Sequence, residues 1–188
     1  MYEFEKVTLS TKLDEKVETE LKDIMEVIDE SKIIDNKSFK DWFWDMFVID
    51  GLIGNTDRHN GNWGFLVNLE TKKIKLSPIY DCGSCLNPML EDSNLFKIDD
   101  KEEKNLAINC YSCIKEEGKR INYMSYIKSM KNDECNRAII RMFPKIDMNK
   151  IKNFIDNIEC ISKVRKEFYY KIMLYRYEII ESVYNKLT

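Results

Sequence analysis

The sequence predicts a mainly α-helical protein that contains one small β-hairpin. Gly contributes 6 and Pro 3 of the 188 residues, which is about 5% of the chain where roughly 12% is usual. So few turn-forming residues disfavour a sandwich or barrel of many short strands. Apolar residues make up 44% of the chain, which is sufficient for a core, and most of them recur at helical spacing. At this length we expect a single domain over residues 1–188.

The first two helices are predicted from the spacing of apolar residues. In the first segment these residues recur every three or four positions, at Leu13, Val17, Leu21, Ile24, Val27 and Ile28. This spacing is typical of an amphipathic helix with a charged outer face. After a polar interruption, Ser38 is the predicted N-cap of a second helix that extends to Ile53. Apolar side chains occur on nearly all sides of this helix, so we expect it to be central and buried.

A β-hairpin is predicted between two polar loops. Residues 54–62 are polar and directly follow the second helix. Residues 63–69 and 74–76 have the composition of two strands, and residues 70–73 form the turn between them. A second polar loop follows at residues 80–84. The hairpin therefore returns the chain so that the second loop opposes the first.

Every pattern from about residue 103 onward is helical. The expected helices span residues 103–116, 120–131, 134–143 and 148–187, and the last allows a break near residue 160. Asp147 is the predicted N-cap of the last segment, because it follows a Phe-Pro break. A stripe of nine apolar residues from Phe154 to Val183 is predicted to be a core face rather than a cofactor site.

Charge and composition exclude several function classes. The formal net charge is −3, so the chain as a whole has no electrostatic attraction to nucleic acid or anionic lipid. His59 is the only histidine, which excludes the zinc-peptidase motif that needs two. The sequence shows no signal peptide and no apolar stretch of roughly 18 residues. We therefore expect a cytoplasmic protein with no membrane partner and no direct nucleic-acid partner.

The two polar loops carry the residues with the clearest chemical meaning. The first loop contains Asp57 and, five residues later, Asn62; the second contains Asp81. Phosphoryl transfer from ATP requires a carboxylate that orients the attacking hydroxyl, and oxygen ligands that hold Mg²⁺ against the phosphates. The three residues have the types and spacing that this chemistry uses. The alternative is that residues 55–57 form only a turn, since Asn and Asp favour turns.

The two loops resemble those of a known kinase family. The segments from Gly54 to Leu66 and from Leu76 to Ser84 are similar to HipA-like kinases, the toxin kinases of bacterial toxin–antitoxin systems and their relatives. Residues 57–62 also resemble the catalytic loop of phosphatidylinositol 3- and 4-kinases. Both groups have the protein-kinase-like fold, so the resemblance implies that this chain is a protein-kinase-like C-terminal lobe.

The resemblance also implies a role for four residues. Asp57 matches the catalytic aspartate, and Asn62 and Asp81 match the residues that bind Mg²⁺ and so hold ATP. His59 matches a histidine of the catalytic loop that either contacts the γ-phosphate or braces the loop. The expected reaction is transfer of a phosphoryl group from ATP to a Ser or Thr hydroxyl of a protein.

The chain is short for a complete kinase. A bilobal kinase has an N-terminal lobe with a Gly-rich phosphate loop and a lysine-bearing strand, and residues 1–56 look mainly helical. We therefore expect the N-terminal lobe to be absent and ATP turnover by the chain alone to be weak or nil. Three explanations stay open, namely a fragment, a split kinase whose N-lobe is another polypeptide, and a degenerate remnant. An N-lobe polypeptide or an antitoxin is a candidate partner. Two other functions stay open, namely a non-catalytic helical interaction module and a lipid or small-molecule kinase.

Two C-x₂-C pairs offer a different kind of site. Cys82 and Cys85 form the first pair, and Cys110 and Cys113 form the second. Four thiolates at such spacing can hold Zn²⁺. Against zinc, the first pair flanks the loop of Asp81, and the second lies in a predicted helix, where cysteines three positions apart often only pack.

Overall fold

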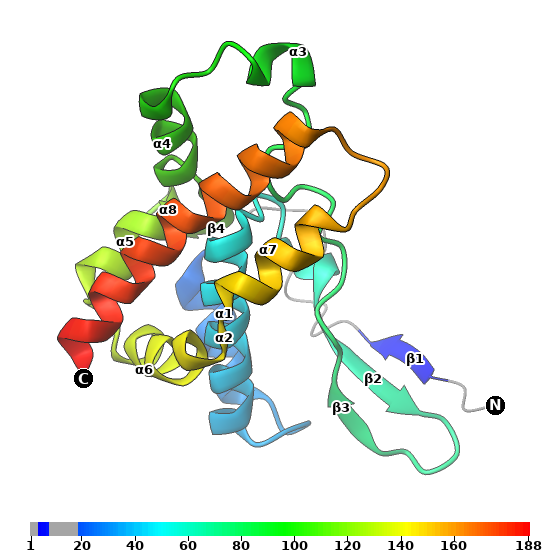
Figure 1. Cartoon of the computed structure of the whole chain (residues 1–188). Helices are drawn as coiled ribbons and strands as arrows, with labels where there is room; N and C mark the ends of the chain where they lie inside the picture. The colour runs from blue at the N-terminus through cyan, green and yellow to red at the C-terminus, as the bar shows by residue number, and fades with distance from the viewer. Residues whose placement is uncertain (1–3, 8–18) are drawn as a thin grey trace.

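The structure is a helical body with two small antiparallel sheets (Figure 1). The computed structural model describes residues 4–7 and 19–188. In chain order the elements are β1 (Phe4–Val7), α1 (Leu21–Glu30), α2 (Asn36–Ile53), the 3₁₀ turn η1 (Asn60–Asn62), β2 (Phe65–Asn68), β3 (Ile74–Leu76), α3 (Asp92–Leu95), α4 (Asp100–Ile108), β4 (Tyr111–Glu116), β5 (Lys119–Asn122), α5 (Tyr123–Ser129), α6 (Asp133–Met142), the 3₁₀ turn η2 (Phe143–Lys145), α7 (Met148–Asp156) and α8 (Lys163–Leu187). The predicted fold class, mainly helical with a small hairpin, is confirmed.

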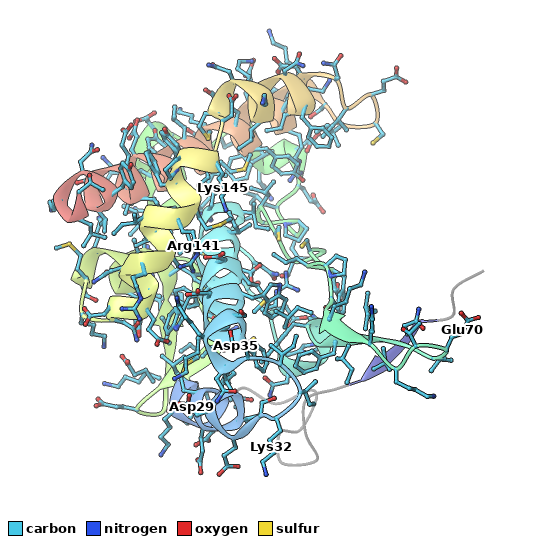
Figure 2. The ribbon with its side chains drawn as sticks, turned by 90° about the horizontal axis from the view of Figure 1, so that it is seen from below. Asp29, Lys32, Asp35, Glu70, Arg141 and Lys145 are labelled. Atoms are coloured by element: carbon cyan, nitrogen blue, oxygen red, sulfur yellow. The ribbon has the colours of Figure 1, made fainter. Side chains whose placement is uncertain are left out.

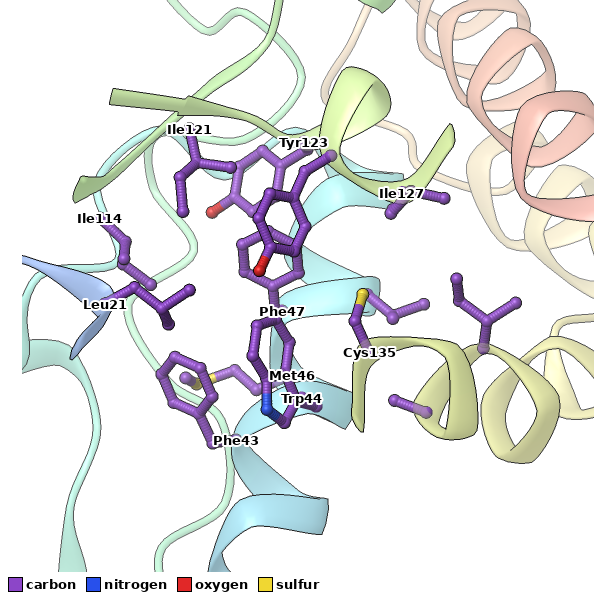
Figure 3. Close-up of a cluster of buried hydrophobic side chains, with 14 of the residues drawn as sticks. Leu21, Phe43, Trp44, Met46, Phe47, Ile114, Ile121, Tyr123, Ile127 and Cys135 are labelled. Atoms are coloured by element: carbon purple, nitrogen blue, oxygen red, sulfur yellow. The ribbon is translucent and has the colours of Figure 1, made fainter. Parts of the chain in front are cut away.

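Helix α2 is the centre of the helical body. It contacts α1, α5, α6 and α8. Its aromatic side chains pack on those of α5, where the ring centroids of Phe47 and Tyr123 are 4.8 Å apart and those of Trp44 and Tyr126 are 5.9 Å apart. Figure 3 shows the rings of Trp44, Phe47 and Tyr123 among aliphatic side chains from other elements, including Leu21, Ile114 and Ile121. Large buried rings provide much of the energy of a core, and the prediction of a central, buried helix is confirmed.

Helix α2 begins three residues earlier than predicted. Asp35, and not Ser38, is the N-cap. The Asp35 carboxylate accepts hydrogen bonds from the Ser38 backbone N–H at 2.8 Å and from the Ser38 hydroxyl at 2.6 Å. Both residue types can cap a helix, but here Ser38 serves as the donor and lies within the first turn.

An arginine ties α6 to the exposed face of α2. Arg141 Nε lies 3.0 Å from Asp45 Oδ1, and Arg141 Nη1 lies 3.1 Å from Asp41 Oδ1. Figure 2 shows Arg141 beside α2, whereas Glu70 lies at the far tip of the β2–β3 hairpin. Such partly exposed ion pairs contribute about 1 kcal/mol or less each, so the packing of α6 on the core rests mainly on its buried residues Cys135, Ala138 and Ile139.

The N-terminal part differs in two ways from the prediction. Helix α1 begins at Leu21, and its buried residues are three of the predicted apolar positions, Leu21, Ile24 and Ile28. Two further predicted positions, Leu13 and Val17, lie outside the described residues. Strand β1 was not predicted; it pairs antiparallel with β2, with Phe4 opposite Asn68. The predicted β2–β3 hairpin is confirmed, with Phe65 opposite Leu76.

The C-terminal half contains a hairpin where helices were predicted. The helix predictions for residues 103–116 and 120–131 are wrong over residues 109–122, because the chain forms β4 and β5 there. The turn between them consists of Glu117 and Gly118, with φ values of 52° and 78°, and a right-handed helix cannot contain such residues. Three consecutive residues of β4 are buried instead of every second one, so the segment lacks the alternation that predicts a strand.

The last two helices agree with the prediction of a break near residue 160. Helix α7 ends at Asp156 and α8 begins at Lys163. Asp147 is the N-cap of α7, as predicted, and its side chain accepts hydrogen bonds from the backbone N–H groups of Asn149 and Lys150. Helix α8 packs against α4, α5, α6 and α7. Within the described ranges, no helix is long and apolar enough to cross a membrane.

Candidate active site

The candidate site is built at the C-terminal end of α2. The helix ends at Gly54, whose φ of 71° is left-handed and suits a glycine. A Cβ atom at this position would lie 2.7 Å from Cζ of Arg176, so a larger residue here would force the guanidinium of Arg176 to move. The chain then turns out of the helix into the loop of residues 55–62.

A buried ion pair fixes this loop to the helix. Asp50 and Arg58 are each 1% exposed, and Arg58 Nε lies 2.8 Å from Asp50 Oδ2. Arg58 Nη2 donates a second hydrogen bond to Asp50 Oδ1 at 3.0 Å, so the contact is bidentate. Burial by itself lowers the pKa of Arg58, but the hydrogen bonds and charge of Asp50 outweigh this and raise the pKa above its ordinary value. Arg58 is therefore charged at any physiological pH.

Asn55 connects the loop to three other segments. Its Nδ2 donates to Asp50 Oδ1 at 3.0 Å, and its Oδ1 accepts from the Asp57 N–H at 3.1 Å and from the Ser84 hydroxyl at 2.6 Å. The Asn55 carbonyl accepts from the Tyr123 hydroxyl of α5 at 2.9 Å. Asn55 is fully buried, and these bonds hold the backbone of Asp57 in one position.

The predicted residues Asp57, His59 and Asn62 all lie in this loop. Asp57 is exposed, His59 is half-buried and Asn62 is buried. Asn62 Nδ2 donates to the Asp57 carbonyl at 2.8 Å, so the structure brings these two residues together. His59 Nδ1 accepts from the Gly61 N–H at 3.1 Å and caps the turn η1. This contact braces the loop.

Arg58 also joins this loop to the loop of Asp81. Its Nη1 donates to the Asn62 carbonyl at 2.8 Å and to the Tyr80 carbonyl. The Tyr80 hydroxyl in turn donates to the Gly61 carbonyl at 2.9 Å. Asp81, the next residue, is therefore held beside the loop that contains Asn62, as the hairpin prediction required.

The carboxylates of Asp57 and Asp81 are free to bind a ligand. Both side chains are exposed, and within residues 4–7 and 19–188 neither carboxylate has a hydrogen bond or an ion pair. Asp81 has a φ of 53°, a conformation that costs a residue with a side chain about 1–3 kcal/mol and is concentrated at functional sites. Asn62 uses its amide nitrogen within the loop, which leaves its amide oxygen. These oxygens are the ligand type that Mg²⁺ prefers, so the donor set fits that ion.

Sequence reasoning missed the residues that hold the site in shape. Asp50, Asn55 and Arg58 are all buried and bonded to one another. One signal was present, because Asp50 is a carboxylate in an otherwise apolar stretch of helix. An unpaired buried carboxylate is very costly, so its presence indicates a nearby cation, and Arg58 is the first basic residue after it.

The four-cysteine zinc site is not formed. All four cysteines are described, and the described part of the chain contains no group of three or more His, Cys, Asp or Glu that could hold a metal ion. Cys110 and Cys113 are buried, and Cys113 lies in β4 rather than in the predicted helix. Burial raises the pKa of the Cys85 and Cys113 thiols to about 12.

Comparison with known proteins shows what this chain is similar to. Residues 3–158 match the family model described as HipA-like C-terminal domain. The chain is 42% identical over 160 residues to the serine/threonine-protein kinase CtkA of Helicobacter pylori strain J99, an alignment that covers 83% of this chain and 49% of that protein. It is also similar to the crystal structure of a Helicobacter pylori proinflammatory kinase CtkA, with a TM-score of 0.87 and 36% identity over 98% of this chain and 71% of that chain.

The matched region includes both polar loops of the candidate site. The structural match confirms the prediction of a protein-kinase-like C-terminal lobe, and the resemblance to HipA-like kinases is confirmed as well. The chain spans about half the length of the curated relative that it matches.

Proposed function

Because the chain belongs to the family of HipA-like C-terminal domains, we propose that it is the catalytic lobe of an ATP-dependent kinase that phosphorylates a Ser or Thr hydroxyl of a protein. The observation that carries the proposal is the double contact of Arg58 Nη1 with the carbonyls of Asn62 and Tyr80. This contact holds Asn62 and Asp81 on the two loops that must cooperate in phosphoryl transfer.

Each of the three oxygen-bearing side chains, Asp57, Asn62 and Asp81, has a role in this proposal. Asp57 orients the acceptor hydroxyl and accepts its proton, which is the role of a general base that lies within hydrogen-bond reach of its substrate. Asn62 and Asp81 hold Mg²⁺ through hard oxygen ligands. Bound Mg-ATP supplies the phosphoryl group, and its metal ion offsets the charge of the phosphates. The free carboxylates of Asp57 and Asp81 support these roles, because nothing in the described chain competes for them.

His59 acts as a positioning residue. Its Nδ1 accepts the Gly61 N–H, so the loop between Asp57 and Asn62 is held in a compact 3₁₀ turn. Phosphoryl transfer depends mainly on positioning, and a residue that orders this turn therefore affects the rate even if it does not contact a phosphate.

The proposal includes a second polypeptide segment. We propose that residues 1–188 act as one domain, and that the contacts to the ATP phosphates that a Gly-rich loop and a lysine provide in other kinases come from an N-lobe that is not among these residues. An antitoxin is a second candidate partner. The chain alone is expected to turn over ATP weakly, and the whole assembly acts in the cytoplasm on a protein.

The test is phosphoryl transfer from radiolabelled ATP to protein, measured for the full chain with and without a candidate N-lobe. We expect Asp57→Asn and Asp81→Asn each to lower the rate by about 10²–10⁴-fold, the usual contribution of such groups. Asp133→Asn, at an exposed position in the first turn of α6, is the matched control and should retain activity. Wild-type rates for Asp57→Asn and Asp81→Asn would overturn the assignment of these residues. No transfer by the wild-type chain with its N-lobe would indicate a non-catalytic interaction module instead.

A further inference from the structure

A pocket of about 450 Å³ lies directly beside the candidate catalytic loop. Its lining residues are all uncharged: Thr56, Ser84, Asn87, Pro88, Met89, Leu90 and Leu106. Thr56 is the residue before Asp57, and Ser84 is three residues after Asp81. The pocket is therefore continuous with the two loops to which the proposed function assigns the chemistry.

The walls of the pocket are held by contacts from several elements. Arg120 of β5 donates to the Thr56 carbonyl at 2.9 Å, and Arg165 of α8 donates to the Leu90 carbonyl. The backbone N–H of Leu86 donates to the Ile53 carbonyl at the end of α2 at 3.1 Å. A site of this size with fixed walls falls within the range of about 300–1,000 Å³ that is usual for preformed ligand pockets.

The segment that forms the outer wall is strained and exposes an apolar side chain. Leu86 and Asn87 have φ values of 57° and 56°, and such strain is concentrated at functional sites. Met89 is 92% exposed, so its apolar surface is not used in the fold. Methionine is flexible and common on surfaces that bind varied apolar partners.

The chemistry of the lining selects the occupant. A second pocket of about 330 Å³ at the β4–β5 hairpin is lined by several charged residues, including Glu117, Lys119 and Arg120. The pocket beside Asp57 contains no charge, so it suits an apolar group rather than a phosphate or an ion. Its hydroxyl and amide groups, on Thr56, Ser84 and Asn87, can hydrogen-bond a peptide backbone, which a lipid chain cannot use.

We propose that this pocket binds a large apolar side chain of the protein substrate, within about three residues of the Ser or Thr that is phosphorylated. This inference rests on the proposed function, because it places the acceptor hydroxyl at Asp57. An extended peptide advances about 3.3 Å per residue, and Thr56 of the pocket wall is the residue before Asp57. Side chains close in sequence to a hydroxyl held at Asp57 therefore lie near the pocket. The pocket thereby selects the substrate sequence, and Met89 is its most accessible determinant.

The test uses the full chain and a set of fluorescent peptides with one Ser in an Ala background. A single Leu, Phe, Asp or Lys replaces Ala at each of the three positions on either side of the Ser. Binding is measured by fluorescence anisotropy, and phosphoryl transfer is measured separately in the presence of the candidate N-lobe. At one position we expect the Leu and Phe peptides to bind at least about tenfold more tightly than the Ala, Asp and Lys peptides. Hydrophobic pockets typically discriminate between side chains of different apolar size by about this factor or more.

The variant Met89→Glu isolates the pocket without a risk to folding, because Met89 is almost fully exposed. It should abolish the preference for Leu and Phe and shift it toward Lys at the same position. Phe96→Glu, an exposed apolar residue that does not line the pocket, is the matched control and should retain the wild-type preference.

The outcomes separate this inference from the proposed function. Phosphoryl transfer to peptides without any side-chain preference would overturn the pocket assignment and leave the kinase intact. A Leu and Phe preference in binding that depends on Met89, with no transfer to any peptide, would support the pocket and contradict the kinase. Transfer to phosphatidylinositol in vesicles but not to peptides would overturn the assignment of a protein substrate.

Discussion

Arg58 and Arg176 are both buried beside the last turn of α2, but only Arg58 has a carboxylate partner within the described chain. Arg58 pairs with Asp50, and the pKa of Arg58 is raised. Arg176 of α8 donates to carbonyl oxygens, from Nε to Ala107 at 2.9 Å and from Nη1 to Leu52 at 3.4 Å. Burial lowers the pKa of Arg176, since no full negative charge opposes the desolvation.

The difference shows two ways in which a protein accommodates a buried cation. The acceptors of Arg176 lie in the last turns of α2 and α4, where unpaired carbonyls and the helix dipole carry partial negative charge. Arg176 therefore fastens helix to helix in the scaffold. Arg58 pairs with the full negative charge of Asp50 and still has donors for two loop carbonyls. It therefore connects helix α2 to both loops of the candidate site.

The largest effect is expected for Arg58→Met. This change leaves Asp50 as a buried, unpaired carboxylate, and breaking such a pair costs about 3–5 kcal/mol of unfolding free energy. The double variant Asp50→Asn/Arg58→Met removes both charges and should recover at least half of the loss, measured by urea denaturation. Phosphoryl transfer should stay low in the double variant, because the Asn62 and Tyr80 carbonyls are no longer joined. A double variant with wild-type activity would show that Arg58 has only a structural role.

A smaller loss is expected for Gly54→Ala, which tests how closely Arg176 approaches the end of α2. The new Cβ would lie 2.7 Å from Arg176 Cζ at a φ of 71°. The matched control is Gly118→Ala, where φ is 78° and no atom lies within 4 Å of the added Cβ. The control should cost only the strain of the left-handed backbone, about 1–2 kcal/mol, and Gly54→Ala should cost clearly more. Equal losses would show that the guanidinium moves aside freely.

The variant Arg176→Met compares the two arginines directly. It leaves the carbonyls of Leu52, Leu106 and Ala107 without this donor but leaves no opposite charge unpaired, so we expect a loss of about 1–3 kcal/mol, less than for Arg58→Met. Thermal and urea unfolding of the two variants under the same conditions provide the measurement. A loss as large as that of Arg58→Met would contradict the distinction between carboxylate and carbonyl partners.

The smallest effect concerns a third arginine, Arg165, whose partner Asp92 is partly exposed. Hydrogen bonds from Ser162 and Arg165 hold the pKa of Asp92 below its usual 3.8. A carboxyl group whose pKa is lowered by folding stabilises the protein above the unfolded value, and this stabilisation is lost as the pH falls through the folded value. The Tm difference between wild type and Asp92→Asn should therefore shrink from pH 6 to pH 3. Glu70→Gln, at the hairpin tip, should show a smaller change.

Sequence patterns predicted the parts of the molecule that are encoded by residue types and spacing within one short segment. The loop with Asp57 and Asn62 was identified because phosphoryl transfer requires an Asp and an Asn at a defined spacing in one loop. The buried face of α1 and the Asp147 cap followed from local spacing as well. The roles of Asp57, His59, Asn62 and Asp81 stay predictions until the variants are measured.

Other parts depend on contacts that no local pattern encodes. The β4–β5 hairpin was missed because β4 is buried over three consecutive residues, and only its tertiary neighbours make it a strand. The N-cap of α2 is Asp35 and not the predicted Ser38. Both residue types can cap a helix, and the sequence alone does not show which of the two does so. Arg176 follows Tyr175 of the predicted apolar stripe but was not itself predicted to be buried, and its contacts with Ala107 and Leu52 link positions 69 and 124 residues apart.

The forked contact of Arg58 also bears on which ion the site accepts. One nitrogen, Nη1, donates to both the Asn62 and the Tyr80 carbonyl, so one rigid side chain sets the separation of the two proposed metal-binding loops. Mg²⁺ binds oxygen at about 2.0–2.1 Å, and Ca²⁺ at about 2.3–2.6 Å with more ligands. Under the proposed function, a larger ion held by Asn62 and Asp81 would require the two loops to separate and Arg58 to move relative to Asp50. The buried Asp50–Arg58 pair would then set the ion size that the proposed site prefers.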